Sequence, residues 1–121
     1  MAYKFNPLAR RFEFVDTSQD SNILTININP GDTGVLDQFV TEDFRQADYL
    51  INIFDETDSK YKGVKLSVLK TDSEVKASVY SVNGDILNVF LDADFSGLNT
   101  EVFLINNTLN ALEIKYSRNI I

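Results

Sequence analysis

The chain has 121 residues and a formal net charge of −7, and it contains no cysteine, histidine or tryptophan. This length predicts one domain, and the missing residue types exclude disulfides, thiolate metal sites, cysteine nucleophiles and histidine general bases. No stretch approaches the ~18 consecutive apolar residues of a transmembrane helix, and the N-terminal residues lack the apolar run of a secretory signal, so we expect no membrane association.

The first 22 residues differ in charge from the rest of the chain. Residues 1–12 contain three basic and no acidic side chains, so the remaining residues, with eight basic and 18 acidic side chains, have a net charge of −10. The segment is too rich in apolar residues for a typical disordered tail. It predicts an extended arm that binds an acidic protein surface, and the candidate binding residues are Tyr3, Lys4, Phe5, Arg10, Arg11, Phe12 and Phe14. The alternative is an N-terminus that frays in solution.

From residue 23 onward, apolar and polar residues alternate with the period of two that is typical of half-buried strands. Such strands are expected at residues 23–28, 35–39, 64–68, 75–79, 87–91, 102–105 and 112–116. Residues 49–54 are nearly all apolar, which predicts a central strand covered on both faces. A helical turn is expected at residues 41–43, and the pair Asn83 and Gly84 predicts a tight hairpin turn.

The number and spacing of these strands indicate the fold class. About seven or eight short antiparallel strands with turn residues between them are typical of a sandwich or a barrel. We therefore predict an all-β domain at residues 23–121, an antiparallel β-sandwich or barrel-like fold of the jelly-roll or immunoglobulin-like kind, preceded by the arm at residues 1–22. An acidic domain repels phosphate groups, so we expect no binding of nucleic acid.

One acidic motif has the spacing of metal ligands. The residues Asp92, Asp94, Ser96 and Gly97 match the first half of an EF-hand calcium loop, but Phe103 occupies the position of the bidentate glutamate. We expect instead a turn at the entry to a strand, in which these side chains bind nearby backbone N–H groups.

A second acidic cluster consists of Asp55, Glu56 and Asp58. Paired carboxylates carry out acid and base catalysis in glycosidases, but these lie in a predicted hairpin loop at residues 55–60, where water screens them. No other part of the sequence supplies both a nucleophile and an activating base. We therefore expect that the chain is not an enzyme and uses neither a metal nor a cofactor.

A pattern of strand and turn residues extends over most of the chain, at residues 44–53, 64–72, 91–99 and 113–118, with a separate short match at residues 1–7. This pattern resembles a β-rich module in structural proteins of tailed phages, notably phages of marine bacteria and cyanobacteria. The resemblance is sharpest at residues 91–99, which are similar to the sequence Phe-Asp-Ala-Asp-Ile-Ser-Gly-Gly-Asn of the family. Leu98 replaces the second glycine of that motif, and Lys70 replaces a usual histidine.

The resemblance implies a structural protein of the virion, assembled in the host cytoplasm. It implies either a capsid-decorating (cement) subunit or a small tail- or fibre-associated subunit, which acts by docking onto other capsid or tail subunits. A homo-oligomer is the expected form, and a trimer is our expectation. The alternative is a receptor- or glycan-binding module of a phage adsorption apparatus, in which the loops at residues 55–60 and 92–99 carry recognition.

Overall fold

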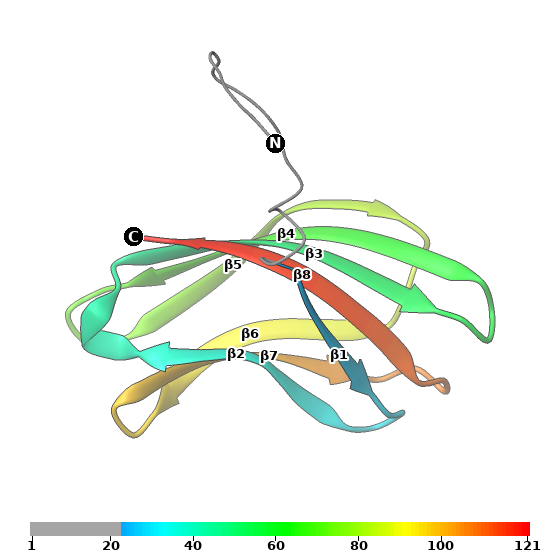
Figure 1. Ribbon diagram of the computed structural model, residues 1–121, viewed down its shortest axis with the longest axis horizontal. Coiled ribbons are helices and arrows are strands. Elements are labelled where there is room, and N and C mark those ends of the chain that lie inside the picture. The colour runs from blue at the N-terminus through cyan, green and yellow to red at the C-terminus, as the bar shows by residue number, and fades with distance from the viewer. Residues whose placement is uncertain (1–22) are drawn as a thin grey trace, which may run out of the picture.

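The computed structural model describes residues 23–121, which form eight strands in two antiparallel sheets (Figure 1). The strands are β1 (Leu24–Ile28), β2 (Thr33–Val40), β3 (Gln46–Asp55), β4 (Lys60–Lys70), β5 (Val75–Gly84), β6 (Val89–Ser96), β7 (Asn99–Asn106) and β8 (Leu112–Ile120). A single 3₁₀ turn at Thr41–Asp43 confirms the predicted helical turn. The prediction of an all-β antiparallel sandwich is confirmed, whereas the predicted arm at residues 1–22 lies outside the described part of the chain.

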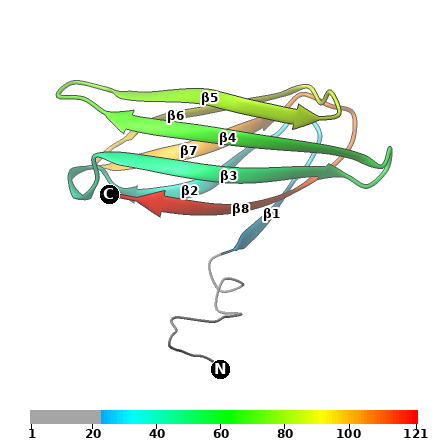
Figure 2. The same ribbon diagram turned by 90° about the horizontal axis from the view of Figure 1, so that it is seen from above.

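The two sheets lie one above the other as separate layers (Figure 1). In the view from above, the five-stranded sheet lies in front of the three-stranded sheet (Figure 2). The five-stranded sheet has the order β1-β8-β3-β4-β5, and the three-stranded sheet has the order β2-β7-β6. The hairpins β3–β4, β4–β5 and β6–β7 stay within one sheet, whereas the connections β1–β2, β2–β3, β5–β6 and β7–β8 cross from one layer to the other. The layers are therefore linked by four crossings of the chain. No helix in residues 23–121 has the length and hydropathy needed to cross a bilayer.

Apolar side chains from the inner faces of both sheets form one core between the layers. Alternate residues of each strand point inward, as the period of two predicts. The buried apolar residues are Ile28, Leu36, Phe44, Ala47, Tyr49, Ile51, Ile53, Val64, Leu66, Val68, Leu87, Ala93, Val102, Leu104, Leu112, Ile114 and Tyr116. Burial of each large side chain contributes about 1.5 to 3 kcal/mol, so this shared core is the main source of stability.

Strand β3 occupies the centre of the five-stranded sheet, as predicted, but the prediction that both of its faces are covered is wrong. Tyr49, Ile51 and Ile53 are buried, whereas Leu50 is 59% exposed and Asn52 is also exposed. The reason is that the three-stranded sheet covers only the inner face of β3. The nearly continuous apolar run therefore leaves Leu50 on the outer surface of the domain.

The predicted hairpin turn at Asn83 and Gly84 is also wrong. Both residues belong to β5, where Asn83 pairs with Gly63 and Gly84 pairs with Lys62 of β4. Gly84 has a φ of 93°, and this positive φ starts the connection that leaves the five-stranded sheet for β6. The conformational freedom of the glycine is therefore used at a crossing between layers and not in a hairpin.

A polar cluster at the inner face of β2 joins the two sheets. A register shift between Val35 and Asp37 in the β2–β7 pairing leaves both Leu36 and Asp37 buried. Such bulges redirect side chains. Tyr49 Oη donates a hydrogen bond of 2.7 Å to Asp37 Oδ2, and Arg118 Nη1 donates to both carboxylate oxygens of Asp37, at 2.6 Å to Oδ2.

The environment of this cluster keeps its phenols protonated. Burial, together with the hydrogen bond to the Asp37 carboxylate, raises the pKa of Tyr49 far above its usual value. Burial likewise raises the pKa of Tyr116, whose hydroxyl donates to the Leu36 carbonyl. The hydrogen bond to Asp37 raises the pKa of Arg118. Both phenols and the guanidinium therefore act as permanent donors, and they tie β3 and β8 to β2.

Candidate functional site

The residues predicted to bind a partner, Tyr3, Lys4, Phe5, Arg10, Arg11, Phe12 and Phe14, lie outside the described residues. The structure therefore leaves that prediction untested. The remaining candidates, the two acidic motifs, lie within the described part of the chain.

The motif at residues 92–97 does not lie at the entry to a strand. Asp92 to Ser96 form the second half of β6, and Gly97, with a φ of 65°, starts the turn into β7. Asp92 Oδ1 accepts a hydrogen bond of 2.8 Å from the N–H of Ala93, and Asp94 Oδ1 accepts one of 2.8 Å from the N–H of Phe95. These are the local backbone contacts that were expected. Residues 23–121 contain no group of three or more carboxylate, histidine or cysteine side chains arranged to hold a metal ion.

The cluster at residues 55–58 is only partly a solvated loop. Asp55 ends β3 and is 1% exposed, which contradicts the prediction that water screens it. Asn110 Nδ2 donates hydrogen bonds of 2.9 Å to both Asp55 and Asp58, and the N–H of Asp58 donates to Asp55 at 3.2 Å. The bond from Asn110 is the main cause that lowers the pKa of Asp55. The Asp55 carboxylate therefore anchors the β3–β4 hairpin to the β7–β8 connection.

The two loops that were expected to carry recognition lie at opposite ends of the sandwich (Figure 1). The β3–β4 hairpin contacts Asn110, in the connection between β7 and β8. The β6–β7 turn lies at the other end, where the carbonyl of Leu98 accepts a 3.0 Å hydrogen bond from the N–H of Thr41. The two loops therefore cannot contribute to one site within a single copy of the chain.

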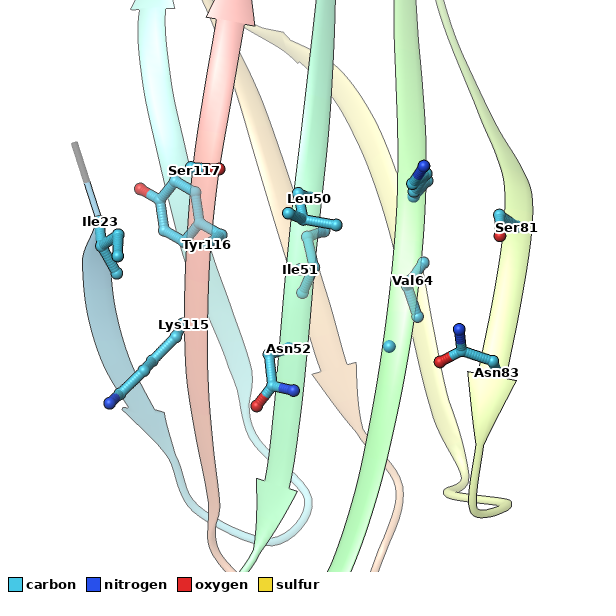
Figure 3. A pocket seen from close by; sticks show the side chains of 12 residues that line it. Ile23, Leu50, Ile51, Asn52, Val64, Ser81, Asn83, Lys115, Tyr116 and Ser117 are labelled. Carbon is cyan, nitrogen blue, oxygen red and sulfur yellow. The ribbon is translucent and has the colours of Figure 1, made fainter. Parts of the chain in front are cut away.

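A groove of about 350 Å³ crosses the outer face of the five-stranded sheet (Figure 3). Two rows of paired residues form it, one consisting of Lys115, Asn52, Gly63 and Asn83, and the other of Ser117, Leu50, Lys65 and Ser81. Because Gly63 has no side chain, the sheet is hollow between β3 and β5, and a Cβ atom at this position would come within 2.7 Å of Asn83 Oδ1. Ile23 lines the groove at the β1 edge.

Most of the exposed lining of the groove is apolar, but the groove also has a positive charge and several hydrogen-bonding groups. No lining residue is acidic, whereas Lys65 and Lys115 both line it. In the described part of the chain the salt bridges are Lys76–Glu74 and Arg118–Asp37, so neither groove lysine is engaged in one there. Asn52, Asn83 and the two serines add amide and hydroxyl groups. The groove can therefore hold an anionic polar ligand.

An aromatic pair continues the groove along β3 and β4. The rings of Phe54 and Tyr61 stack with centroids 4.6 Å apart and an interplanar angle of 20°, and Tyr61 is 55% exposed. Phe54 is two residues from Asn52 on β3, and Tyr61 is two residues from Gly63 on β4, so both rings are on the same outer face. Sequence reasoning missed this site, although an isolated glycine inside a strand is a known signal of a close approach by another group.

Comparison with known proteins identifies the fold. No family model and no curated protein sequence matches the chain. The crystal structure of the tailspike protein of Acinetobacter phage vB_ApiP_P1 matches 99% of this chain, with a TM-score of 0.62 and 10% sequence identity. The match covers 26% of that tailspike, so the present chain spans about a quarter of its length. The sandwich fold is therefore shared with one part of a phage tailspike protein.

A second structure is less similar. The tailspike protein gp49 of the Acinetobacter baumannii bacteriophage Fri1, a capsular polysaccharide depolymerase, matches 79% of this chain and 17% of its own chain, with 19% identity and a TM-score of 0.37.

Proposed function

We propose that this chain is a phage virion protein associated with the tail or its fibres, and that it acts by docking onto other virion proteins. The observation that carries this proposal is the match of nearly the whole chain to one part of a tailspike protein. The sequence resemblance to structural proteins of tailed phages supports the same assignment. Tail association is preferred over capsid decoration because the fold match is to a tailspike.

The structure is suited to a docking role. The core is closed by two sheets, and the buried polar groups of Asp37, Tyr49 and Arg118 bond to one another. Such a rigid body loses little conformational entropy when it binds. Repeated copies on a symmetric particle bind with avidity, so that each contact can be weak. A cyclic homo-oligomer, with a trimer as the expected form, would provide this repetition. We infer that the chain binds and does not catalyse.

The number of copies in the particle tests this proposal. Particles of the phage that encodes the chain are purified, and the copies per particle are counted by quantitative mass spectrometry. Labelled antibody then locates the protein by electron microscopy. We expect label on the tail, with copies on the order of a dozen, because a tail offers few symmetric positions compared with a capsid. Label spread over the capsid in hundreds of copies would favour decoration, and absence from the particle would refute a virion role.

The groove on the five-stranded sheet supports a second candidate function, the binding of a receptor or glycan. A saccharide needs amide and hydroxyl partners and a flat apolar ring to stack on. The groove offers Asn52 and Asn83, and the exposed Tyr61 lies next to it, two residues along β4 from Gly63. The two lysines favour an anionic glycan, because charge-assisted hydrogen bonds to carboxylates are the stronger ones.

A glycan array with the purified full-length chain tests the second candidate. We expect binding to acidic oligosaccharides such as polyuronates and polysialic acid, and none to neutral glucans of the same length. Lys65→Ala combined with Lys115→Ala should lower the affinity at least tenfold. The matched control is Lys76→Ala, because Lys76 is exposed on β5 outside the groove. Equal binding by the double variant and the control would refute the glycan site.

A further inference from the structure

The outer face of the three-stranded sheet is apolar at one end. Val35 on β2 lies directly opposite Phe103 on β7, and Ile105 on β7 lies directly opposite Phe90 on β6. Phe90 is 51% exposed, Val35 is 41% exposed, and the other two are partly buried. The outer face of a two-layer sandwich is normally polar. A contiguous apolar patch across three strands is typical of a surface that binds another protein.

Acidic side chains continue this surface toward the other end of the sheet. Asp92 lies opposite Phe103, and Asp94 lies opposite Glu101. Like charges directly opposite each other destabilise a sheet, and β2, β6 and β7 contain no lysine or arginine. Within residues 23–121 none of the three carboxylates has a salt bridge. A partner that brings basic and apolar side chains together would relieve the repulsion and cover the patch.

The chain itself contains a segment of this chemistry. Residues 1–14 include three basic side chains among four aromatic ones, and their first acid is Glu13. Fourteen extended residues span at most about 50 Å, whereas a strand of eight residues is roughly 26 Å long. The segment is therefore long enough to run over the whole outer face. We propose that the outer face of the three-stranded sheet binds residues 1–14 of a second copy of this chain.

The position of Ile23 favours a second copy over the same copy. Ile23, the first described residue, lines the groove on the outer face of the five-stranded sheet, in the layer opposite the acidic surface. The strands of that sheet hold seven of the eight basic residues in the described part of the chain. A second copy that places its acidic face there would meet both the N-terminal segment and Lys65 and Lys115. Such a contact is heterologous and builds rings or stacks.

The inference rests on the proposed docking function and names a second copy as the partner. The test of this inference uses only the pure full-length protein. A failure of self-association is therefore distinguished from a failure of the proposed virion role, which is measured on purified particles. Light scattering after size-exclusion chromatography gives the mass of three proteins at low and at physiological salt. These are the wild type, a sheet variant with Asp92→Lys and Asp94→Lys, and an arm variant with Lys4→Glu, Arg10→Glu and Arg11→Glu.

We expect the wild type to be oligomeric, more strongly at low salt, and each variant to be at least tenfold weaker in association. An equimolar mixture of the two variants should associate again, because the basic segment of one meets the acidic sheet of the other. A monomeric wild type, or a mixture that stays monomeric, would overturn the proposal, and a monomeric wild type is what binding within one copy predicts.

Two further variants separate a loss of contact from a loss of fold. Asp72→Lys with Glu74→Lys makes the same charge change in the exposed β4–β5 turn and should leave association intact. Phe90→Ser removes an exposed aromatic ring from the apolar patch and should weaken association at least tenfold while the circular dichroism spectrum stays that of the wild type. Association unchanged in Phe90→Ser and in the sheet variant would overturn the proposal.

Discussion

The two sheets have the same kind of inner face but very different charges. The five strands of the larger sheet contain seven basic and three acidic residues, whereas the three strands of the smaller sheet contain four acidic residues and no basic one. The inner faces must be apolar because they form one core, but no such requirement acts on the outer faces. The charge of each outer face therefore depends on what that face contacts. Under our proposals, the five-stranded sheet contacts an anionic polar ligand and the three-stranded sheet contacts a basic apolar segment.

The comparison also shows why the layers need specific links. Four chain crossings and a shared apolar core hold the sheets together, but apolar contacts alone do not fix how one sheet is placed on the other. The Asp37 cluster and the Asp55 cluster supply directional bonds at two different places. Substitutions at these places, and at the crossing after β5, test how the two sheets depend on each other.

The largest effect is expected for Asp37→Ala. The change leaves the Tyr49 hydroxyl buried without its acceptor and leaves Arg118 without its counter-ion. Removal of one partner of a fully buried pair costs about 3 to 5 kcal/mol, but the Arg118 side chain is 39% exposed and regains water. We expect a loss of about 2 to 3 kcal/mol in the free energy of unfolding, measured by urea denaturation.

Asp94→Ala is the matched control for this substitution, because Asp94 is on the same sheet but points to the outer face. It should change stability by less than about 0.5 kcal/mol. A double-mutant cycle with Tyr49→Phe adds a second check, since the two substitutions remove the same hydrogen bond and should not be additive. Additive losses, or equal losses for Asp37 and Asp94, would show that the cluster does not link the sheets.

Much of the fold could be predicted from the sequence because it depends on local pattern. The alternation of apolar and polar residues located all eight strands to within a few residues, and the β2–β3 helical turn was also found. Which strands share a sheet depends on contacts between distant residues. The pattern therefore could not show that the chain crosses to the other layer after β5. The pair Asn83 and Gly84 is typical of a hairpin, and it predicts the wrong connection for this reason.

The sites were harder to predict because burial depends on register. From the sequence, Asp37 is an ordinary polar residue in a short strand. Its side chain points inward only because of the bulge in β2. From the sequence, Asp55 belongs to an acidic loop. It links two loops only because Asn110, 55 residues later in the chain, donates a hydrogen bond to its carboxylate. The groove combines residues of four strands with no local motif. In contrast, the glycine at position 63 was visible as a signal and could have been used.

An intermediate effect is expected for Gly84→Ala, at the crossing from the five-stranded to the three-stranded sheet. Gly84 has a φ of 93°, and a Cβ atom would collide with the backbone carbonyl of Tyr61. We expect a loss of about 1 to 3 kcal/mol, measured by thermal and urea unfolding. Gly63→Ala is the matched control. Its Cβ atom meets only the end of the Asn83 side chain, which can rotate. Because alanine is favoured over glycine inside a strand by roughly 0.5 to 1 kcal/mol, we expect no loss of stability and at most a gain of about 1 kcal/mol. Equal losses would show that the positive φ is not required.

The smallest effect, and the most dependent on pH, is expected for Asp55→Asn. The hydrogen bond from Asn110 holds the pKa of Asp55 below its ordinary value of 3.8, so the unfolded chain takes up this proton before the folded chain does. The stabilisation is therefore complete above about pH 5 and is lost progressively as the pH falls through the ordinary and then the lowered pKa. The melting temperature of the variant should lie below that of the wild type at neutral pH, and this difference in melting temperature should become smaller in acid.

The matched control is Asp72→Asn, in the exposed β4–β5 turn, which should have the melting temperature of the wild type at either pH. If the difference in melting temperature between Asp55→Asn and the wild type stays constant from neutral to acid pH, Asp55 stabilises the fold by its shape and not by its charge. The link between the β3–β4 hairpin and the β7–β8 connection would then be steric.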